Sequence, residues 1–329
     1  MKQYFKYLLS LVIGVILPFV AKAHIKWFVD VEDIRATNQS VEFFTWFSKP
    51  VWVWIVIAVG LIGLAKFFNR KLPEPQGLLE FGKKHQVIIY RGFKFLIGLF
   101  LVSISGFWHI ILIPQISVSG SVEQILQIWQ GIVGLMLMFN VWPKMASLML
   151  AGLYFLTGWF GGLEFYLENV ILLAIVIFIF LQELQSEQRF YLYKSWAMPI
   201  LRIGTGVSLI VLAFTEKFLH PELSLNFLQQ HNWNFIQLAG WNFSNELFVL
   251  SAGFMETIFG LIFILGYIVR INTIVMSGFF ATSVTTMALQ SGVWEVEDLV
   301  IYAVAIMFIF FHSLNMAKSK KSELTSSER

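Results

Sequence analysis

The chain contains no cysteine among its 329 residues. Without thiols it cannot form disulfides, thiolate metal sites, cysteine-ligated iron–sulfur clusters or covalently attached haem. Any metal or redox chemistry must therefore depend on histidine, on carboxylates or on a bound organic cofactor.

Charged residues are also scarce, at 13% of the sequence against about 25% in an ordinary soluble domain. Hydrophobic residues make up 57% and fall in long blocks, which is typical of helices that span a lipid bilayer. Lysine and arginine lie between these blocks and form no basic patch, which excludes nucleic acid as a partner. The composition predicts an all-α integral membrane protein.

Residues 1–23 have the pattern of a secretory signal peptide. Lys2 and Lys6 precede an apolar run, and the segment ends in the small residues Ala21 and Ala23 around Lys22. The alternative is an uncleaved first span. Residues 24–86 are expected to form an outer polar segment, one extra transmembrane helix and an inner loop.

The remaining apolar blocks predict a bundle of nine spans, or ten if the first segment is retained. We expect these spans at about 51–68, 87–113, 123–141, 144–160, 164–183, 199–219, 246–267, 272–290 and 298–314. If the N-terminus starts inside, the lysines and arginines between spans fall mainly in inner loops, and the loop 221–245 outside has none. The C-terminus is then cytoplasmic.

Two parts of the chain, 87–183 and 199–314, resemble each other and are joined by an inner linker, 184–198. A basic and polar inner tail, 315–329, follows the second part. Polar residues of the two parts match at nearly constant differences in residue number. The difference is 111 for Arg91 with Arg202 and for His109 with His220. It is 126 for Gln130 with Glu256 and for Lys144 with Arg270, and 129 for Glu168 with Glu297. Four spans return the chain to its starting side, so we expect two parallel repeats.

Polar residues near the end of the predicted span 199–219 are the first candidates for chemistry. On an α-helix Glu216 and His220 share a face, and Lys217 lies beside them. A carboxylate next to an imidazole can accept and release protons near neutral pH. The structural alternative is a set of interfacial residues that closes the end of a helix.

Glu256 lies about ten residues into the predicted span 246–267 and therefore near mid-membrane depth. A carboxylate there costs at least about 2.5 kcal/mol unless it is partnered or protonated, and Lys217 is the first candidate partner. The corresponding residues of the first repeat are Gln130, Ser105 and Gly106. The second repeat is thus better equipped for chemistry. We expect its polar site towards the outer leaflet.

Histidines and acids suggest weaker sites for metals or haem. The pseudo-equivalent His109 and His220 could ligate a b-type haem, and His24 could chelate copper if cleavage made it the N-terminus. Glu297 and Asp298 could contribute to an outer metal site, although acids also cap the start of a helix. No HxH, HxxxH or HExxH spacing supports a metal site.

Residues 199–314 resemble the DoxX family of four-helix bacterial membrane proteins. The resemblance depends on Arg202-x-x-x-Gly206, Glu216-Lys217, Gly253-x-x-Glu256-x-x-x-Gly260, Arg270 and Glu297. Residues 87–183 look like a divergent copy that keeps Arg91, Gly134 and Lys144. The resemblance implies a protein of the bacterial cytoplasmic membrane.

Relatives of that family include membrane subunits associated with quinone-linked oxidoreductases. The leading hypothesis is therefore a membrane subunit that binds a quinone headgroup, with protons carried by Glu216, His220 and Glu256. Its electrons would come from a redox partner protein or from a further cofactor. Lys217 would orient the headgroup or balance Glu256. The alternatives are a proton- or metal-coupled transporter between the repeats and a non-catalytic assembly protein. Against the transporter, no span has a middle interrupted by glycine and proline.

Overall fold

The computed structural model describes residues 43–73, 75–107, 109–113, 120–184, 191–231, 233–291 and 298–311. Over these ranges the chain folds into helices joined by short turns, with one isolated bridge between Ile111 and Ile113 and no named strand. The predicted all-α class is confirmed. The expected signal segment, most of the polar segment after it and the basic tail lie outside the described residues.

Five helices of the described part are long and apolar enough to cross a membrane. They are α4 (Lys49–Lys71), α6 (Gln86–Gly106), α8 (Pro143–Glu168), α13 (Asn245–Leu265) and the stretch Trp196–Phe218, which joins most of α10 (Tyr191–Ala213) to η3 (Phe214–Phe218). This is the composition of a multi-pass membrane protein. The finer expectation of nine or ten spans is not matched one for one.

The other predicted spans are shorter or less apolar helices. They are α7 (Ser121–Met138), α9 (Val170–Glu183), α14 (Val269–Ser291) and α15 (Asp298–Phe311). The predicted spans 144–160 and 164–183 divide differently in the structure: the helix breaks at Gly162, which has φ 71°, and again at Asn169. Only glycine adopts the backbone angles of Gly162 without strain. The helix therefore breaks at this residue.

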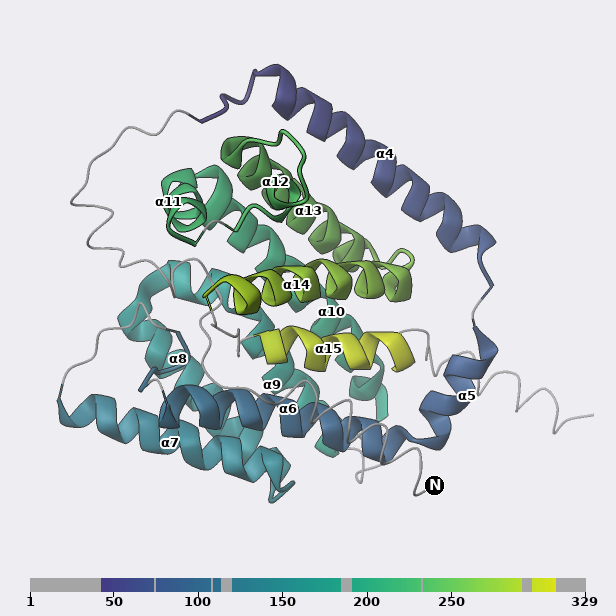
Figure 1. Cartoon of the computed structure of the whole chain (residues 1–329). Helices are drawn as coiled ribbons and strands as arrows, with labels where there is room; N and C mark the ends of the chain where they lie inside the picture. Colours follow the sequence, from purple (N-terminus) through teal and green to yellow (C-terminus); the bar gives the residue numbers. More distant parts are fainter. Residues whose placement is uncertain are drawn as a thin grey trace, which may run out of the picture.

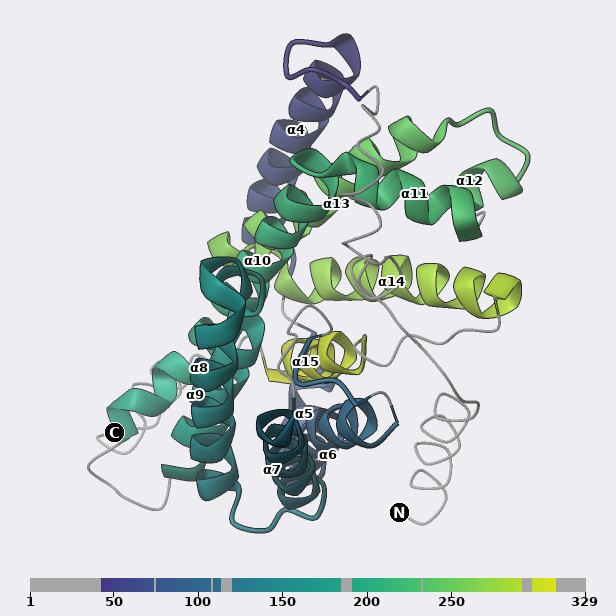
Figure 2. The ribbon, with the colours of Figure 1, turned by 90° about the vertical axis from the view of Figure 1, so that its left-hand side faces the viewer.

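The helices form two rows, visible in Figures 1 and 2. One row has the order α4, α13, α10, α9, α8, and the other has the order α14, α15, α6, α7. The rows meet at their ends, where α13 contacts α14 and α7 contacts α8. Setting α4 aside, each row contains two consecutive helices from each half of the chain, so the two halves are interlocked rather than side by side.

The order of helices in one row becomes the order in the other when equivalent helices are exchanged. The equivalent helices of the two halves are α6 and α10, α7 and α13, α8 and α14, and α9 and α15. When each helix is exchanged for its equivalent, the first-row order α13, α10, α9, α8 becomes α7, α6, α15, α14. This is the order of the second row, taken from its other end. The last helix of each half thus packs along the first helix of the other half. The order of helix contacts is therefore the same in the two rows.

Glycines allow the first two helices of each half to cross closely. A Cβ on Gly206 would lie 2.6 Å from the carbonyl oxygen of Gly260, and Gly98 and Gly134 are related in the same way. Small residues at such crossings let helix backbones approach within a membrane, where no hydrophobic effect drives helices together.

The turn after the second helix has the same backbone in both halves. Positive φ angles occur at Asn140 and Trp142 in the first half and at Gly266 and Ile268 in the second, with the same offset of 126. Each turn also has an N–H that donates to the carbonyl oxygen five residues earlier, at 2.8 Å and 3.2 Å. Positive φ angles are uncommon for residues other than glycine, such as Asn140, Trp142 and Ile268.

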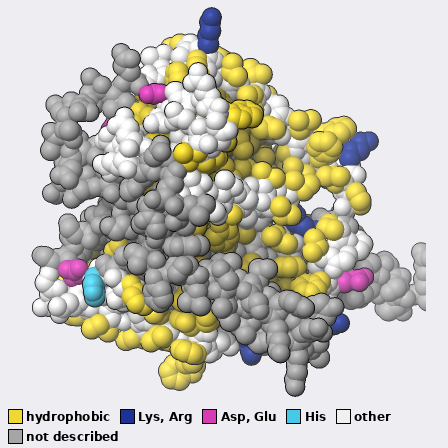
Figure 3. Space-filling view, in the orientation of Figure 1, with side chains coloured by type: hydrophobic (Ala, Val, Ile, Leu, Met, Phe, Trp, Pro, Cys, Tyr) yellow, Lys and Arg dark blue, Asp and Glu magenta, His cyan; other side chains and the backbone are white. Residues whose placement is uncertain are grey.

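Two helices lie outside this pattern. One face of α4 packs on α13, and its other faces carry exposed apolar side chains. In Figure 3 hydrophobic side chains gather along this flank. Lys49 begins α4, and Arg70 and Lys71 lie in its last turn. The flank is suited to lipid contact. The short α5 (Gln76–Lys84) packs against α15.

Candidate functional site

The end of α10 changes into a π-helix, η3, where an unbroken span was predicted. The N–H of Leu219 donates to the carbonyl oxygen of Phe214 at 2.8 Å, five residues back rather than four. The wider turn displaces the carbonyl of Glu216, which accepts the hydroxyl of Ser224 from α11 (Pro221–His231) at 2.8 Å. π-turns inside α-helices occur frequently at functional sites.

The π-helix places Glu216 and Lys217 in the interior of the bundle, opposite Glu256. Lys217 Nζ lies 3.0 Å from Glu256 Oε2 and 3.6 Å from Glu216 Oε2. The three side chains are 10%, 10% and 2% exposed, in the order Lys217, Glu256, Glu216. We call these three residues the charge cluster. One ammonium is shared by two carboxylates, and the expected contact of Glu256 with Lys217 is present.

The cluster lies deep in the bundle rather than at its surface. Glu256 is near the middle of α13, which runs from Asn245 to Leu265. Beyond η3, α11 turns back along the first half of α13, and its apolar residues Leu223 and Phe227 pack with Phe248. The predicted outer loop 221–245 therefore folds over the cluster and buries part of itself. Trp233 in this loop donates from Nε1 to the carbonyl oxygen of Ser283, at 3.1 Å, which ties the loop to α14.

Gly253 makes room for η3 against α13. A Cβ at this position would lie 2.8 Å from the ring of Phe218 and 3.2 Å from Cβ of Lys217. Any larger residue would push η3 away and lengthen the contact of Lys217 with Glu256. Gly253 thus allows η3 to pack closely against α13, and this close packing keeps Lys217 within reach of Glu256.

A series of aromatic rings includes two residues of η3, Phe214 and Phe218. Trp46 stacks on Phe214 with ring centroids 6.4 Å apart and an interplanar angle of 22°, and Phe214 contacts Phe218 at 5.2 Å. Phe218 continues the series to Phe254 at 5.2 Å. Trp46 is 52% exposed and Phe214 37% exposed, so this end of the series is an exposed aromatic surface.

His220 makes a contact outside the charge cluster. Its side chain is 58% exposed, and its Nδ1 lies 3.0 Å from Oε1 of Glu222. The i,i+4 face expected for Glu216 and His220 is lost because η3 ends at Phe218 and the chain turns before Pro221 begins α11.

In the described part of the chain, the candidate haem and metal ligands do not come together as a binding site. His109 is exposed, with φ 54°, in the loop after α6, and His220 is exposed at the start of α11. Neither imidazole has the buried setting of a haem ligand. Within the described residues no three His, Asp or Glu side chains gather as a metal site. His24, Glu297 and the side chain of Asp298 lie outside the described residues.

Gln130 occupies the corresponding place in the first half and is fully buried. It accepts the N–H of Leu112 at 2.8 Å and donates to the carbonyl oxygen of Ile110 at 3.0 Å, so it holds the loop 109–113 inside the bundle. In both halves this position binds the segment that follows the first helix. The first half uses neutral hydrogen bonds, and the second uses charges.

The glycine crossings relate α6 to α10 by 108 positions, since Gly98 corresponds to Gly206. The sequence comparison used 111, a difference of nearly one helical turn. By the structural relation His109 corresponds to Lys217, and Lys94 corresponds to Arg202. The sequence comparison gave Gly106 as the equivalent of Lys217 in the first half, whereas the structural relation gives His109.

A second charged group, missed from the sequence, joins α6 to the end of α9. Lys94, 3% exposed, donates to Glu183 Oε1 at 2.8 Å, and the same oxygen accepts the hydroxyl of Tyr90 at 2.9 Å. The ammonium also lies 4.2 Å from the centre of the Tyr90 ring. The available signal was a lysine within an apolar run, one turn after Arg91. This group ties two helices with every charge paired.

Comparisons with protein families, with characterised proteins and with solved structures give no match to this chain.

Proposed function

We propose that this chain is a DoxX-like protein of the bacterial cytoplasmic membrane, formed by two tandem four-helix repeats, that serves a quinone-linked oxidoreductase as a membrane subunit. In this proposal the charge cluster of Glu216, Lys217 and Glu256 exchanges protons with the quinone headgroup. The observation that carries it is the buried ammonium of Lys217, held 3.0 Å and 3.6 Å from two carboxylates.

The chemistry of a quinol matches the groups in and around the cluster. Oxidation of a quinol to a quinone releases two protons and two electrons, so its site needs proton acceptors beside an apolar ring surface. Glu216 and Glu256 are the acceptors, the ammonium of Lys217 can donate a hydrogen bond to a quinone oxygen, and the electrons pass to a redox partner protein. Trp46 and Phe214 offer exposed rings against which the headgroup can stack.

The repeats are supported by the backbone as well as by the sequence. The equivalent turns at Asn140 and Gly266, the equivalent glycine crossings and the two rows of helices all relate the same pairs of helices. Within this frame the second repeat has charges where the first has Gln130. We infer that the first repeat is a scaffold and the second carries the activity.

Bound quinone in the purified protein tests the proposal. The protein is extracted from membranes in mild detergent, and quinone is measured per protein by chromatography of an organic extract. We expect the wild type and the control Glu80→Gln, which removes an exposed carboxylate on α5, to retain quinone, whereas Lys217→Met loses it. Glu256→Gln should retain quinone with altered proton release on oxidation of an added quinol. Equal retention by wild type and Lys217→Met, or none in either, contradicts the proposal.

A proton-coupled carrier is the second candidate because a cavity lies between the halves, among helices of both rows. Proteoliposomes with an enclosed pH indicator separate the two candidates. A substrate-dependent pH change that is lost in Glu256→Gln, in vesicles free of quinone, favours the carrier. If neither quinone retention nor proton movement changes in cluster variants, the remaining alternative is an assembly protein in which the charges only hold helices together.

A further inference from the structure

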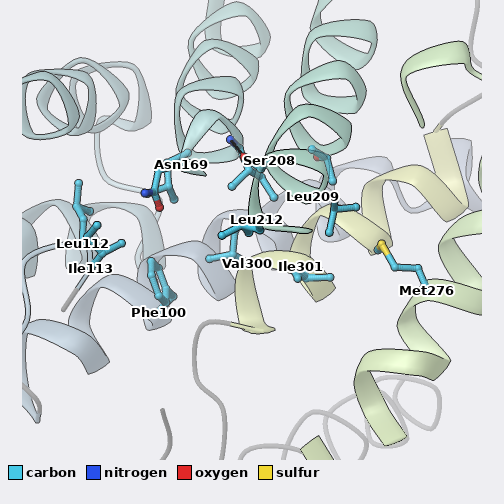
Figure 4. Close-up of a pocket in the computed structure, with 13 residues that line it drawn as sticks. Phe100, Leu112, Ile113, Asn169, Ser208, Leu209, Leu212, Met276, Val300 and Ile301 are labelled. Carbon is cyan, nitrogen blue, oxygen red and sulfur yellow. Dashed lines mark hydrogen bonds between the residues drawn. The ribbon is translucent and has the colours of Figure 1, made fainter. Parts of the chain in front are cut away.

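A cavity of about 70 Å³ lies between the two rows of helices. Its walls come from α6, α9, α10, α14, α15 and the loop 109–113 (Figure 4). The side chains of Asn169, Ser208, Leu212 and Val300 converge in the centre of the view, and Met276 points its sulfur towards the same space. The cavity is therefore built by both halves of the chain.

None of the thirteen residues that line the cavity is ionisable. Three are polar, and each is engaged within the chain. The hydroxyl of Thr205 donates to Leu201 O at 2.8 Å, Ser208 Oγ accepts the N–H of Ile171 at 2.8 Å, and Asn169 donates to the carbonyl oxygen of Phe165 at 3.1 Å. The rest of the wall is aliphatic apart from Phe100 and Met276. A charged ligand would be unpaired there, whereas a neutral apolar ligand matches the mainly aliphatic wall.

The cavity lies towards the membrane face where α6 and α10 end and α9 and α15 begin. Phe100 lies in the second half of α6, Ile171 is at the start of α9, and Val300 is at the start of α15. Leu212, on the cavity wall, precedes Glu216 by four residues, about one helical turn. The cavity and the charge cluster are therefore neighbours along α10 and η3.

We propose that this cavity binds a hydrocarbon chain, either the isoprenoid tail of a quinone or an acyl chain of a phospholipid. Apolar cavities exclude water, and an empty one loses the dispersion contacts of its walls. Lipid chains are the apolar molecules that surround helices such as α6 and α10. This proposal does not depend on the quinone function, because a phospholipid chain meets the same requirements.

Two substitutions should fill the cavity without removing a charge or a hydrogen bond. Leu212 and Ile301 line it and are partly buried, so Leu212→Phe and Ile301→Phe would place a ring in the space that the chain uses. The matched control is Val275→Phe, which adds the same ring at a position 51% exposed, next to the wall residue Met276. Thermal unfolding of each variant in detergent shows whether it remains folded.

Photolabelling tests the proposal in the full-length protein. Wild type and variants are reconstituted with phosphatidylglycerol that carries a diazirine on one acyl chain, or with a farnesyl quinone that carries a diazirine on its tail. We expect one of the two probes to label peptides containing Leu209, Met276 or Val300 in the wild type and in Val275→Phe, and this label to be lost in the folded filling variants. The probe that labels identifies the source of the chain.

Two outcomes would overturn the proposal. One is that neither probe labels these peptides in the wild type, and the other is that the filling variants are labelled as strongly as the control. Labelling by the phospholipid probe alone, together with a purified protein that holds no quinone, would retain the cavity site and reject the quinone function.

Discussion

Removing Lys217 should destabilise the protein more than removing either carboxylate of the charge cluster. Lys217→Met leaves Glu216 and Glu256 facing each other without their shared ammonium, in side chains that are 2% and 10% exposed. Removing one partner of a buried ion pair typically costs about 3–5 kcal/mol. We expect a loss in that range.

The distances set the scale of this loss. With an effective dielectric constant of about 20, the gross attraction between unit charges is about 5–6 kcal/mol at the 3.0 Å separation from Glu256 and about 4–5 kcal/mol at the 3.6 Å separation from Glu216. The desolvation of three buried groups offsets most of this attraction, which is why the net loss is smaller than the sum.

Glu256→Gln should cost less, about 1–3 kcal/mol, because Lys217 keeps Glu216 and the new amide keeps one hydrogen bond. The first half already has Gln130 in the equivalent place. Combining Lys217→Met with Glu216→Gln and Glu256→Gln removes all three charges, so we expect the triple variant to recover part of the loss caused by Lys217→Met alone.

Unfolding by titration with SDS from a mild detergent, followed by circular dichroism, measures these differences. Wild type, Glu80→Gln, the two single variants and the triple variant are compared in the same detergent. If Lys217→Met is within about 0.5 kcal/mol of the wild type, as is usual for surface substitutions, or is no worse than Glu256→Gln, the description of a buried, shared ammonium is wrong.

Three further predictions use the same unfolding assay. Gly253→Ala should cost about 1–3 kcal/mol by overpacking against Phe218, and it should weaken quinone retention; an unchanged protein would show that η3 is free to move. Lys94→Met should cost about 1–3 kcal/mol, less than Lys217→Met, because Glu183 is 23% exposed and keeps a second donor; an equal or larger loss would contradict this ranking. His220→Ala should stay within about 0.5 kcal/mol of the wild type and leave bound quinone unchanged, since its ring is exposed; a loss of quinone would return this histidine to the site.

Much of the architecture could be read from apolar blocks, because a bilayer requires each crossing segment to satisfy its own backbone hydrogen bonds. The blocks indicated helices and their approximate limits, and Gly162 lies where one predicted span was expected to end. The offset of 126 between Gln130 and Glu256 also agrees with the equivalent turns in the structure. The offset of 111 for the first helices did not agree, because matching single polar residues across apolar helices leaves the register free by about one turn.

Some residues of the candidate site could be selected from the sequence, and others could not. Glu216, Lys217 and Glu256 could be selected from the sequence because a charged residue within an apolar block is energetically costly to place in a membrane. Such residues usually have a structural or functional role. His220 was added on the assumption of an unbroken α-helix, and η3 removes that assumption. Lys94 and Glu183 were missed because they are distant in sequence and only the packing of α6 with α9 joins them.

By itself the sequence determined that this chain is a helical membrane protein with an internal resemblance, because hydrophobicity and spacing are local properties. Only the tertiary structure decided which helices meet. The exchange of partners between halves, the π-turn at Glu216 and the cavity between the rows all depend on how glycine crossings set the distances between helices. Those distances bring one ammonium between two carboxylates, and no local pattern encodes them.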